Sequence, residues 1–180
     1  DAYPENLKNI SLKHFIRGIN KAEPSLIRTE ADELSYSLHI IIRYEIEKMI
    51  FSGEADVDKL PDLWNKKYEE YLGITPSNDS EGILQDTHWS YGEFGYFPSY
   101  AIGSAVAAQI YAKMKDLMPV DQYLLDGNIT PIREYLRDAI HKYGATKNTN
   151  QILKEVTGEE LKADYYVNYL KDKYEKLYNL

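Results

Sequence analysis

The chain has 180 residues, 43% hydrophobic and 28% charged, which is typical of a globular domain and argues against disorder. Its formal net charge is −8 and it has no basic run, so a nucleic-acid partner is not expected. No apolar run approaches the roughly 20 residues that span a bilayer, and the absence of cysteine excludes disulfides and cysteine-ligated metals.

Helical patterns begin close to the start of the chain. The opening DAYPENLKN has no methionine, and we interpret it as the start of a piece cut from a longer protein. Ser11–Asn20 carries apolar residues at helical spacing behind a possible serine N-cap. In Glu23–Phe51, apolar residues at steps of three and four predict one helix of about seven turns. Gly53 is expected to end it.

A polar stripe accompanies this long helix. Arg28, Asp32, Ser35 and His39 recur at steps of four, three and four residues, so they should border its buried face. Arg28 and Asp32 are expected to form an i, i+4 ion pair. Two interpretations remain open. One is an ordinary solvated pair, and the other is a guanidinium held by Asp32 at a cleft edge, ready to bind a carboxylate or phosphate.

The later elements have recognisable start and stop signals. A helix is predicted over Pro61–Leu72, a turn-rich loop follows at Thr75–Gly82, and the helical pattern resumes after Pro98. Further helical segments are predicted over Asp121–Leu125, Thr130–Gly144, Thr149–Thr157 and Glu159–Leu180. The sequence shows no strand of useful length and no repeat, so the predicted fold class is all-α. We expect residues 1–180 to form a single helical region.

The stretch Gly82–Tyr100, GILQDTHWSYGEFGYFPSY, concentrates polar and aromatic hydrogen-bonding groups that no helix or strand period explains. We therefore predict that it lines part of a binding or catalytic cleft. A nearby Asp can fix the tautomer of a His, and Tyr hydroxyls can donate to an oxyanion. The alternative is that the aromatic rings are core and the His is a satisfied buried side chain. The candidate residues are Gln85, Asp86, His88, Trp89, Tyr91, Tyr96 and Tyr100, together with Arg28.

Two motifs resemble those of the thermostable (Taq-type) zinc carboxypeptidases. GILQDTHW at Gly82–Trp89 is similar to their GXXQDXHW motif, and IRTEAD at Ile27–Asp32 is similar to their I/VRXXAD motif. The resemblance extends over all 180 residues, as the C-terminal part of a longer chain. It implies a helical, two-lobed body around a deep groove, usually a homodimer. It also implies an exopeptidase that uses one zinc ion to remove C-terminal residues from peptides with broad specificity.

The resemblance also implies roles for particular residues. In that family an HEXXH helix and a later glutamate bind the zinc, and the motif glutamate is the general base. This chain has no HEXXH, so the zinc ligands are expected upstream and none within it. By motif position, Arg28 should bind the substrate's terminal carboxylate and Asp32 should orient it. His88 and Tyr100, with Tyr96 as an alternate, should stabilise the oxyanion. The residues expected to shape and brace the loop are Gln85, Asp86 and Trp89.

Competing functions remain open. The chain is either part of a metallocarboxypeptidase, inactive alone and active in the full-length protein, or a non-catalytic helical module for interaction or dimerisation. A further idea is that the chain binds zinc itself through His39 or His88. The expected partners are peptide substrates, the missing N-terminal part and a second copy. A cytoplasmic location is expected, with no nucleic acid or membrane as partner.

Overall fold

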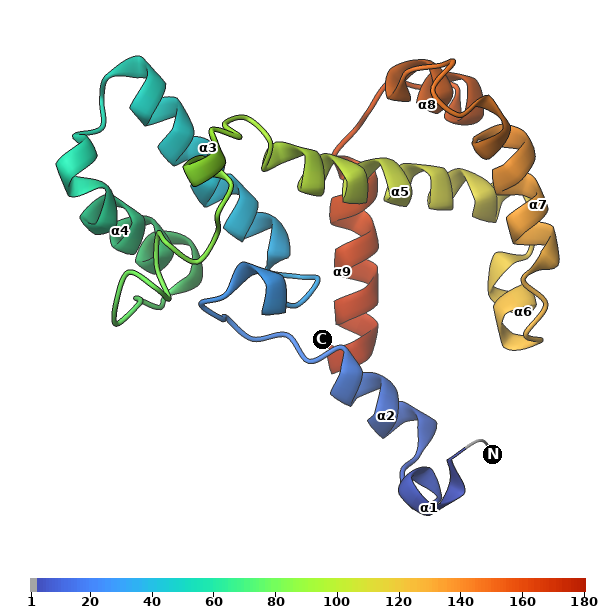
Figure 1. Ribbon diagram of the computed structural model, residues 1–180. Helices are drawn as coiled ribbons and strands as arrows, with labels where there is room; N and C mark the ends of the chain where they lie inside the picture. Colours follow the sequence, from blue (N-terminus) through green and yellow to red (C-terminus); the bar gives the residue numbers. More distant parts are fainter. Residues whose placement is uncertain (1–2) are drawn as a thin grey trace. The chain divides into compact units, whose positions relative to one another are not determined.

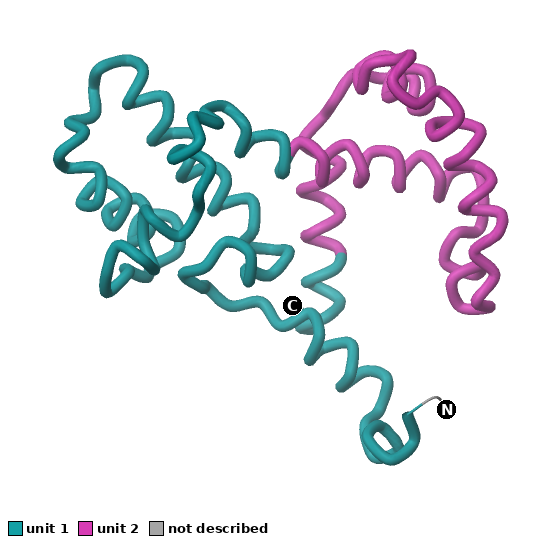
Figure 2. Tube along the Cα trace, in the orientation of Figure 1, with its two compact units in different colours: residues 1–101, 173–180 teal, residues 102–172 magenta. Residues whose placement is uncertain are grey.

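A computed structural model describes residues 3–180, and all the regular secondary structure in this range is helical (Figure 1). The predicted all-α class is therefore confirmed. None of the helices in this range is long and apolar enough to cross a membrane. The chain divides into two compact units (Figure 2), Asp1–Ala101 with Lys173–Leu180, and Ile102–Asp172.

Unit 1 holds the candidate site. Ser11 caps its second helix, because the serine side chain accepts a hydrogen bond from the backbone N–H of His14. Gly53 and Gly73 end two longer helices in the left-handed conformation, with φ of 78° and 70°. The elements are α1 (Pro4–Leu7), α2 (Leu12–Ile19), η1 (Arg28–Glu30), α3 (Tyr36–Ser52), η2 (Val57–Lys59), α4 (Leu60–Leu72) and η3 (Trp89–Tyr91). Residues of α5 (Pro98–Leu117) and α9 (Asp164–Tyr178) belong to both units.

The predicted single helix over Glu23–Phe51 is wrong. Only one 3-10 turn, η1, forms near its start, and α3 begins at Tyr36. The cause is Asp32, whose carboxylate accepts hydrogen bonds from the backbone N–H groups of Leu34 and Ser35 at 2.9 and 3.0 Å. Such local side-chain bonds stabilise a turn and compete with the helical hydrogen-bond ladder. The apolar periodicity before Tyr36 is therefore not that of a helix.

The core of unit 1 lies between α3 and α4. Ile42 and Ile46, one turn apart on α3, pack against Trp64, Tyr68 and Leu72, which follow one another at the same spacing on α4. The rings of Trp64 and Tyr68 stack with centroids 5.0 Å apart. Each of these buried side chains contributes about 1.5–3 kcal/mol through removal of apolar surface from water. This core fixes the two helices that carry the site.

All the regular secondary structure of unit 2 is helical. Its buried Gln109, on α5, binds the segment before α9, because its amide donates to the Glu160 carbonyl at 3.0 Å and accepts from Lys162 N–H at 2.9 Å. The predicted helix Thr130–Gly144 ends at Ala139 and continues as a 3-10 turn. The remaining elements are α6 (Val120–Leu125), α7 (Thr130–Ala139), η4 (His141–Tyr143) and α8 (Thr149–Thr157).

Candidate functional site

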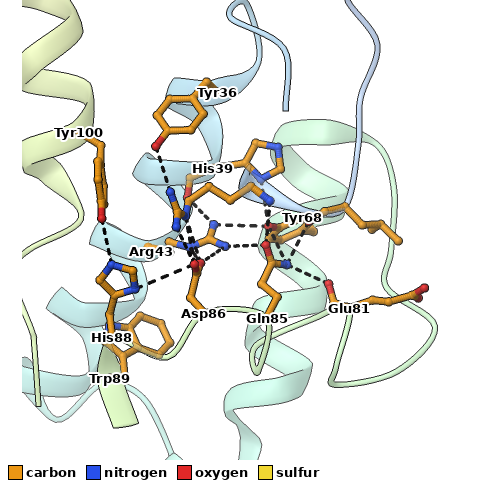
Figure 3. Close-up of polar contacts among 12 residues, drawn as sticks. Tyr36, His39, Arg43, Tyr68, Glu81, Gln85, Asp86, His88, Trp89 and Tyr100 are labelled. Carbon is orange, nitrogen blue, oxygen red and sulfur yellow. Dashed lines mark hydrogen bonds and ion pairs between the residues drawn. The ribbon is translucent and has the colours of Figure 1, made fainter. Parts of the chain in front are cut away.

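Two arginines share one carboxylate at the centre of the site. Arg28 donates to Asp86 from Nε at 3.2 Å and from Nη2 at 2.7 Å. Arg43, from α3, donates to the other oxygen of Asp86 from Nε at 2.8 Å (Figure 3). The three side chains are only 8%, 0% and 10% exposed. Because the ions are hardly exposed to solvent, this cluster is held far more tightly than a surface ion pair.

The cluster fixes the ionisation of its members. Burial alone would raise the pKa of Asp86, but the hydrogen bonds from Arg28 and the charge of Arg43 lower it below its ordinary value. Burial would likewise lower the pKa of Arg28, yet bonding to Asp86 raises it above the usual value. Asp86 is therefore a carboxylate and both arginines are charged. The cluster contains two positive charges and one negative charge.

Gln85 connects the cluster to three segments of the chain. Its side-chain oxygen accepts from the Arg28 backbone N–H and from Arg43 Nη2, both at 2.9 Å. Its amide group donates to the carbonyl oxygens of Leu26 at 3.0 Å and Glu81 at 2.8 Å (Figure 3 labels Gln85 and Glu81). Through these hydrogen bonds Gln85 holds the extended segment before η1 against α3. The bracing role expected for Gln85 stays a prediction.

The predicted ion pair between Arg28 and Asp32 is wrong. Asp32 accepts from backbone N–H groups and from Ser35 Oγ at 2.9 Å, whereas Arg28 bonds to Asp86 and donates from Nη1 to the Tyr36 hydroxyl at 3.0 Å. The pairing fails because residues 28–32 are not α-helical, so a spacing of four does not bring them together. Asp86 and Tyr36, not Asp32, hold the guanidinium.

His88, Tyr96 and Tyr100 lie in contact with one another. His88 Nε2 lies 3.1 Å from the Tyr100 hydroxyl (Figure 3), and the Tyr96 and Tyr100 rings pack edge to face with centroids 5.4 Å apart. Arg28 lies against the Tyr100 ring, with Cζ 5.0 Å from its centroid. His88 Nδ1 is 3.9 Å from Asp86 Oδ1, too long for a hydrogen bond. Burial raises the pKa of Tyr100 above its ordinary value, and the nearby Tyr96 raises it further. The phenol of Tyr100 therefore stays protonated.

Trp89 belongs to the support of the site. Its indole N–H donates to Glu47 Oε1 at 2.6 Å, and the other oxygen of Glu47 accepts from the Gly95 backbone at 3.0 Å. The indole also contacts the Trp64 ring edge to face at 6.1 Å. Trp89 thereby attaches the loop to α3 and to the core.

His39 is buried beneath the arginines. Its side chain is inaccessible to solvent, and Nδ1 lies 3.0 Å from the Tyr68 hydroxyl (Figure 3). Burial, followed by the charges of Arg43 and Arg28, lowers the pKa of His39 from 6.5 to about 4. His39 is therefore a neutral core residue at physiological pH.

Sequence reasoning missed Arg43, Tyr36 and Glu47. One signal could have found two of them, because His39, Arg43 and Glu47 follow one another at a spacing of four in a segment otherwise rich in Ile. Such a spacing places all three on one helix face, and all three are buried. Charged residues on a buried face are paired, and their partners come from Gln85–Trp89.

A metal centre is not formed by the described residues. Among residues 3–180, no group of three or more His, Asp or Glu side chains could hold a metal ion. The idea that His39 or His88 binds zinc therefore finds no ligand set in this range. The residues present do not fit a zinc site.

Comparison with known proteins identifies the family. Residues 1–174 match the carboxypeptidase Taq (M32) metallopeptidase family. Carboxypeptidase 1 of Bacillus subtilis (strain 168) is 55% identical over 100% of this chain and 36% of its own length. Thermostable carboxypeptidase 1 of Thermus thermophilus is 40% identical over 96% of this chain and 34% of its own length.

Solved structures agree with this assignment. The M32 carboxypeptidase from Deinococcus radiodurans R1 superimposes with a TM-score of 0.96 at 35% identity, over 100% of this chain and 37% of that protein. The chain thus spans about a third of the length of the relatives that it matches. The sequence matches and the shared helical fold together show that the chain belongs to the carboxypeptidase Taq (M32) metallopeptidase family.

Proposed function

We propose that this chain forms the C-terminal third of a metallocarboxypeptidase that removes C-terminal residues from peptides with broad specificity. Membership of a metallopeptidase family supports a metal-dependent hydrolase, and the relatives are named carboxypeptidases. In this proposal residues 1–180 are one region of the longer enzyme and are inactive alone. The full-length protein is a cytoplasmic homodimer without a nucleic-acid or membrane partner.

The metal of the family is proposed to be zinc, bound by the N-terminal part of the same protein. This placement is supported by the lack of a ligand cluster among residues 3–180. The role of the present chain is then to bind and orient the peptide. Its charged and phenolic groups are suited to that role because they are already held in place by hydrogen bonds.

The positive charge of the cluster is the observation that carries this proposal. Arg28 and Arg43 share the single carboxylate of Asp86. The nearby Glu47 carboxylate is occupied by Trp89 and Gly95, so it does not balance the second arginine by a direct contact. A buried cation without a matching anion is costly, and the terminal carboxylate of a peptide would supply that anion.

Arg28 is accordingly proposed to attract the substrate's terminal carboxylate. Asp86 and Gln85 position it through the contacts described above. Asp32 acts indirectly, because the turn that it stabilises ends the segment that carries Arg28. Helix α3 then begins at Tyr36. The guanidinium is then presented by the turn and not by a helix.

Tyr100 and His88 are proposed to stabilise the oxyanion of the tetrahedral intermediate. A protonated phenol beside Arg28 is a suitable donor to a developing negative charge, and His88 orients it through the 3.1 Å contact. Tyr96, which is 50% exposed, is the alternate donor because it packs on both rings. Trp89 braces the loop that carries them.

The proposal can be tested on the full-length protein with its metal. Arg28→Ala should reduce kcat/KM for peptides by an amount equivalent to about 2–5 kcal/mol, while metal content is retained. Arg133→Ala, an exposed arginine on α7, is the matched control and should leave kcat/KM unchanged.

Two results would contradict the proposal. Equal hydrolysis of peptides with free and amidated C-termini would remove the role given to Arg28. An upstream sequence without HEXXH would favour the non-catalytic interaction module instead.

A further inference from the structure

Tyr36 lies beside Arg28, at a position that no sequence motif marks as functional. It is the first residue of α3, and its side chain is partly exposed. Figure 3 shows its hydroxyl directed into the cluster, where it meets Arg28 Nη1 at 3.0 Å. Tyr36 therefore contacts the buried ion pairs and is itself partly exposed.

The direction of this hydrogen bond is fixed by chemistry. A guanidinium has donors and no acceptor, so the Tyr36 hydroxyl must accept from Arg28. Its own proton must then point elsewhere. Within the described range of the chain, the bond from Arg28 is the one hydrogen bond that this hydroxyl makes. The phenol thus retains a donor that no side chain or carbonyl of residues 3–180 uses.

Three of the five N–H groups of Arg28 are already used. Nε and Nη2 both donate to Asp86, and Nη1 donates to Tyr36. The bidentate face formed by Nε and Nη2 is therefore taken by Asp86. The residue as a whole is only 6% exposed, so its two remaining N–H groups have little access to solvent. A ligand carboxylate would have to be met by a group that extends further toward solvent.

Tyr36 meets this requirement. Accepting a bond from a cation polarises its hydroxyl and makes it a stronger donor. Resting on the function proposed above, we infer that the Tyr36 hydroxyl donates a hydrogen bond to the C-terminal carboxylate of the peptide. Arg28 then contributes its charge from behind Tyr36, and Tyr36 helps to determine specificity for a free carboxylate over an amide.

The test uses the full-length protein and a pair of competing ligands, alanine and alaninamide, neither of which has a peptide bond to cleave. Tyr36→Phe removes one oxygen and keeps the ring. The affinity ratio of acid over amide should fall roughly 10- to 100-fold, as for loss of a hydrogen bond to a charged group. Tyr44→Phe is the matched control, because Tyr44 lies on the same helix and is 46% exposed, and it should leave the ratio unchanged.

A wild-type structure with bound alanine gives a second measurement that does not depend on a variant. A carboxylate oxygen is expected about 2.7 Å from the Tyr36 hydroxyl. Tyr36 has no such role if the acid-to-amide ratio is unaltered in Tyr36→Phe, or if the bound carboxylate lies out of hydrogen-bond reach of the hydroxyl. These outcomes are separate from failure of the proposed function, which would appear as a wild-type protein that hydrolyses no peptide, because the binding ratio can be measured without turnover.

Discussion

Replacing Asp86 with asparagine removes the carboxylate that Arg28 and Arg43 share while keeping the shape of the side chain. At an effective dielectric constant of about 20 and a charge separation of about 4 Å, each Asp86–arginine pair contributes about 4 kcal/mol of attraction. The variant no longer has the free-energy cost of burying a charged carboxylate, and the asparagine side chain keeps one hydrogen-bond acceptor. The expected net loss in the free energy of unfolding is therefore about 3–5 kcal/mol, as for other broken buried pairs.

Urea denaturation of the chain measures this loss. Both of its tryptophans, Trp64 and Trp89, lie in unit 1 next to the site, so their fluorescence reports on the relevant unit. Asp138→Asn is the matched control, since Asp138 pairs with Arg137 at the surface and the two side chains are 60% and 56% exposed. That variant should leave the free energy of unfolding nearly unchanged, because solvent screens an exposed ion pair. Equal effects of the two substitutions would refute the buried, shared carboxylate.

Two further predictions concern the groups beneath and beside the cluster. Because the pKa of His39 falls from 6.5 to about 4 on folding, the unfolded chain binds a proton more readily. The free energy of unfolding should have its full value above pH 6.5 and should fall by about 3 kcal/mol as the pH drops to 4. His39→Gln should flatten this dependence in urea titrations, and an equally steep loss would contradict the assignment. Glu47→Gln leaves the donor of Trp89 or Gly95 without a good acceptor and should cost about 1–3 kcal/mol of unfolding free energy. Unchanged stability and tryptophan fluorescence in that variant would show that Glu47 does not anchor the loop.

The helices with clear caps and one buried face were predictable. Pro61–Leu72 was expected and α4 spans Leu60–Leu72, and the Thr149–Thr157 segment matches α8. In both, a proline or capping residue at the start and a glycine at the end agree with the apolar period. The prediction of a single helix over Glu23–Phe51 was wrong because a periodic apolar pattern does not reveal a competing turn. The Asp32 carboxylate stabilises that turn by bonds that no period count detects.

The site was predictable as a set of residues but not as a set of contacts. Gln85, Asp86 and His88 were correctly expected to come together with Arg28, because motif residues gather at one place in a family. The partner of Arg28 was assigned by helical spacing, and that spacing applies only where the helix exists. Arg43 was not predicted as a site residue, because the apolar residues around it in the sequence indicate a core helix. Such a pattern does not predict a buried charge.

Local chemistry in the sequence determined the all-α class, most helix ends and the family. These features depend on residues that are near one another along the chain, or on motifs read directly. Only the tertiary structure decided that Asp86, from a loop, would hold two arginines from two other segments. Such pairing depends on how α3, α4 and the loop pack together. A buried charge accepts whichever partner the packing brings within reach, and that partner is distant in sequence.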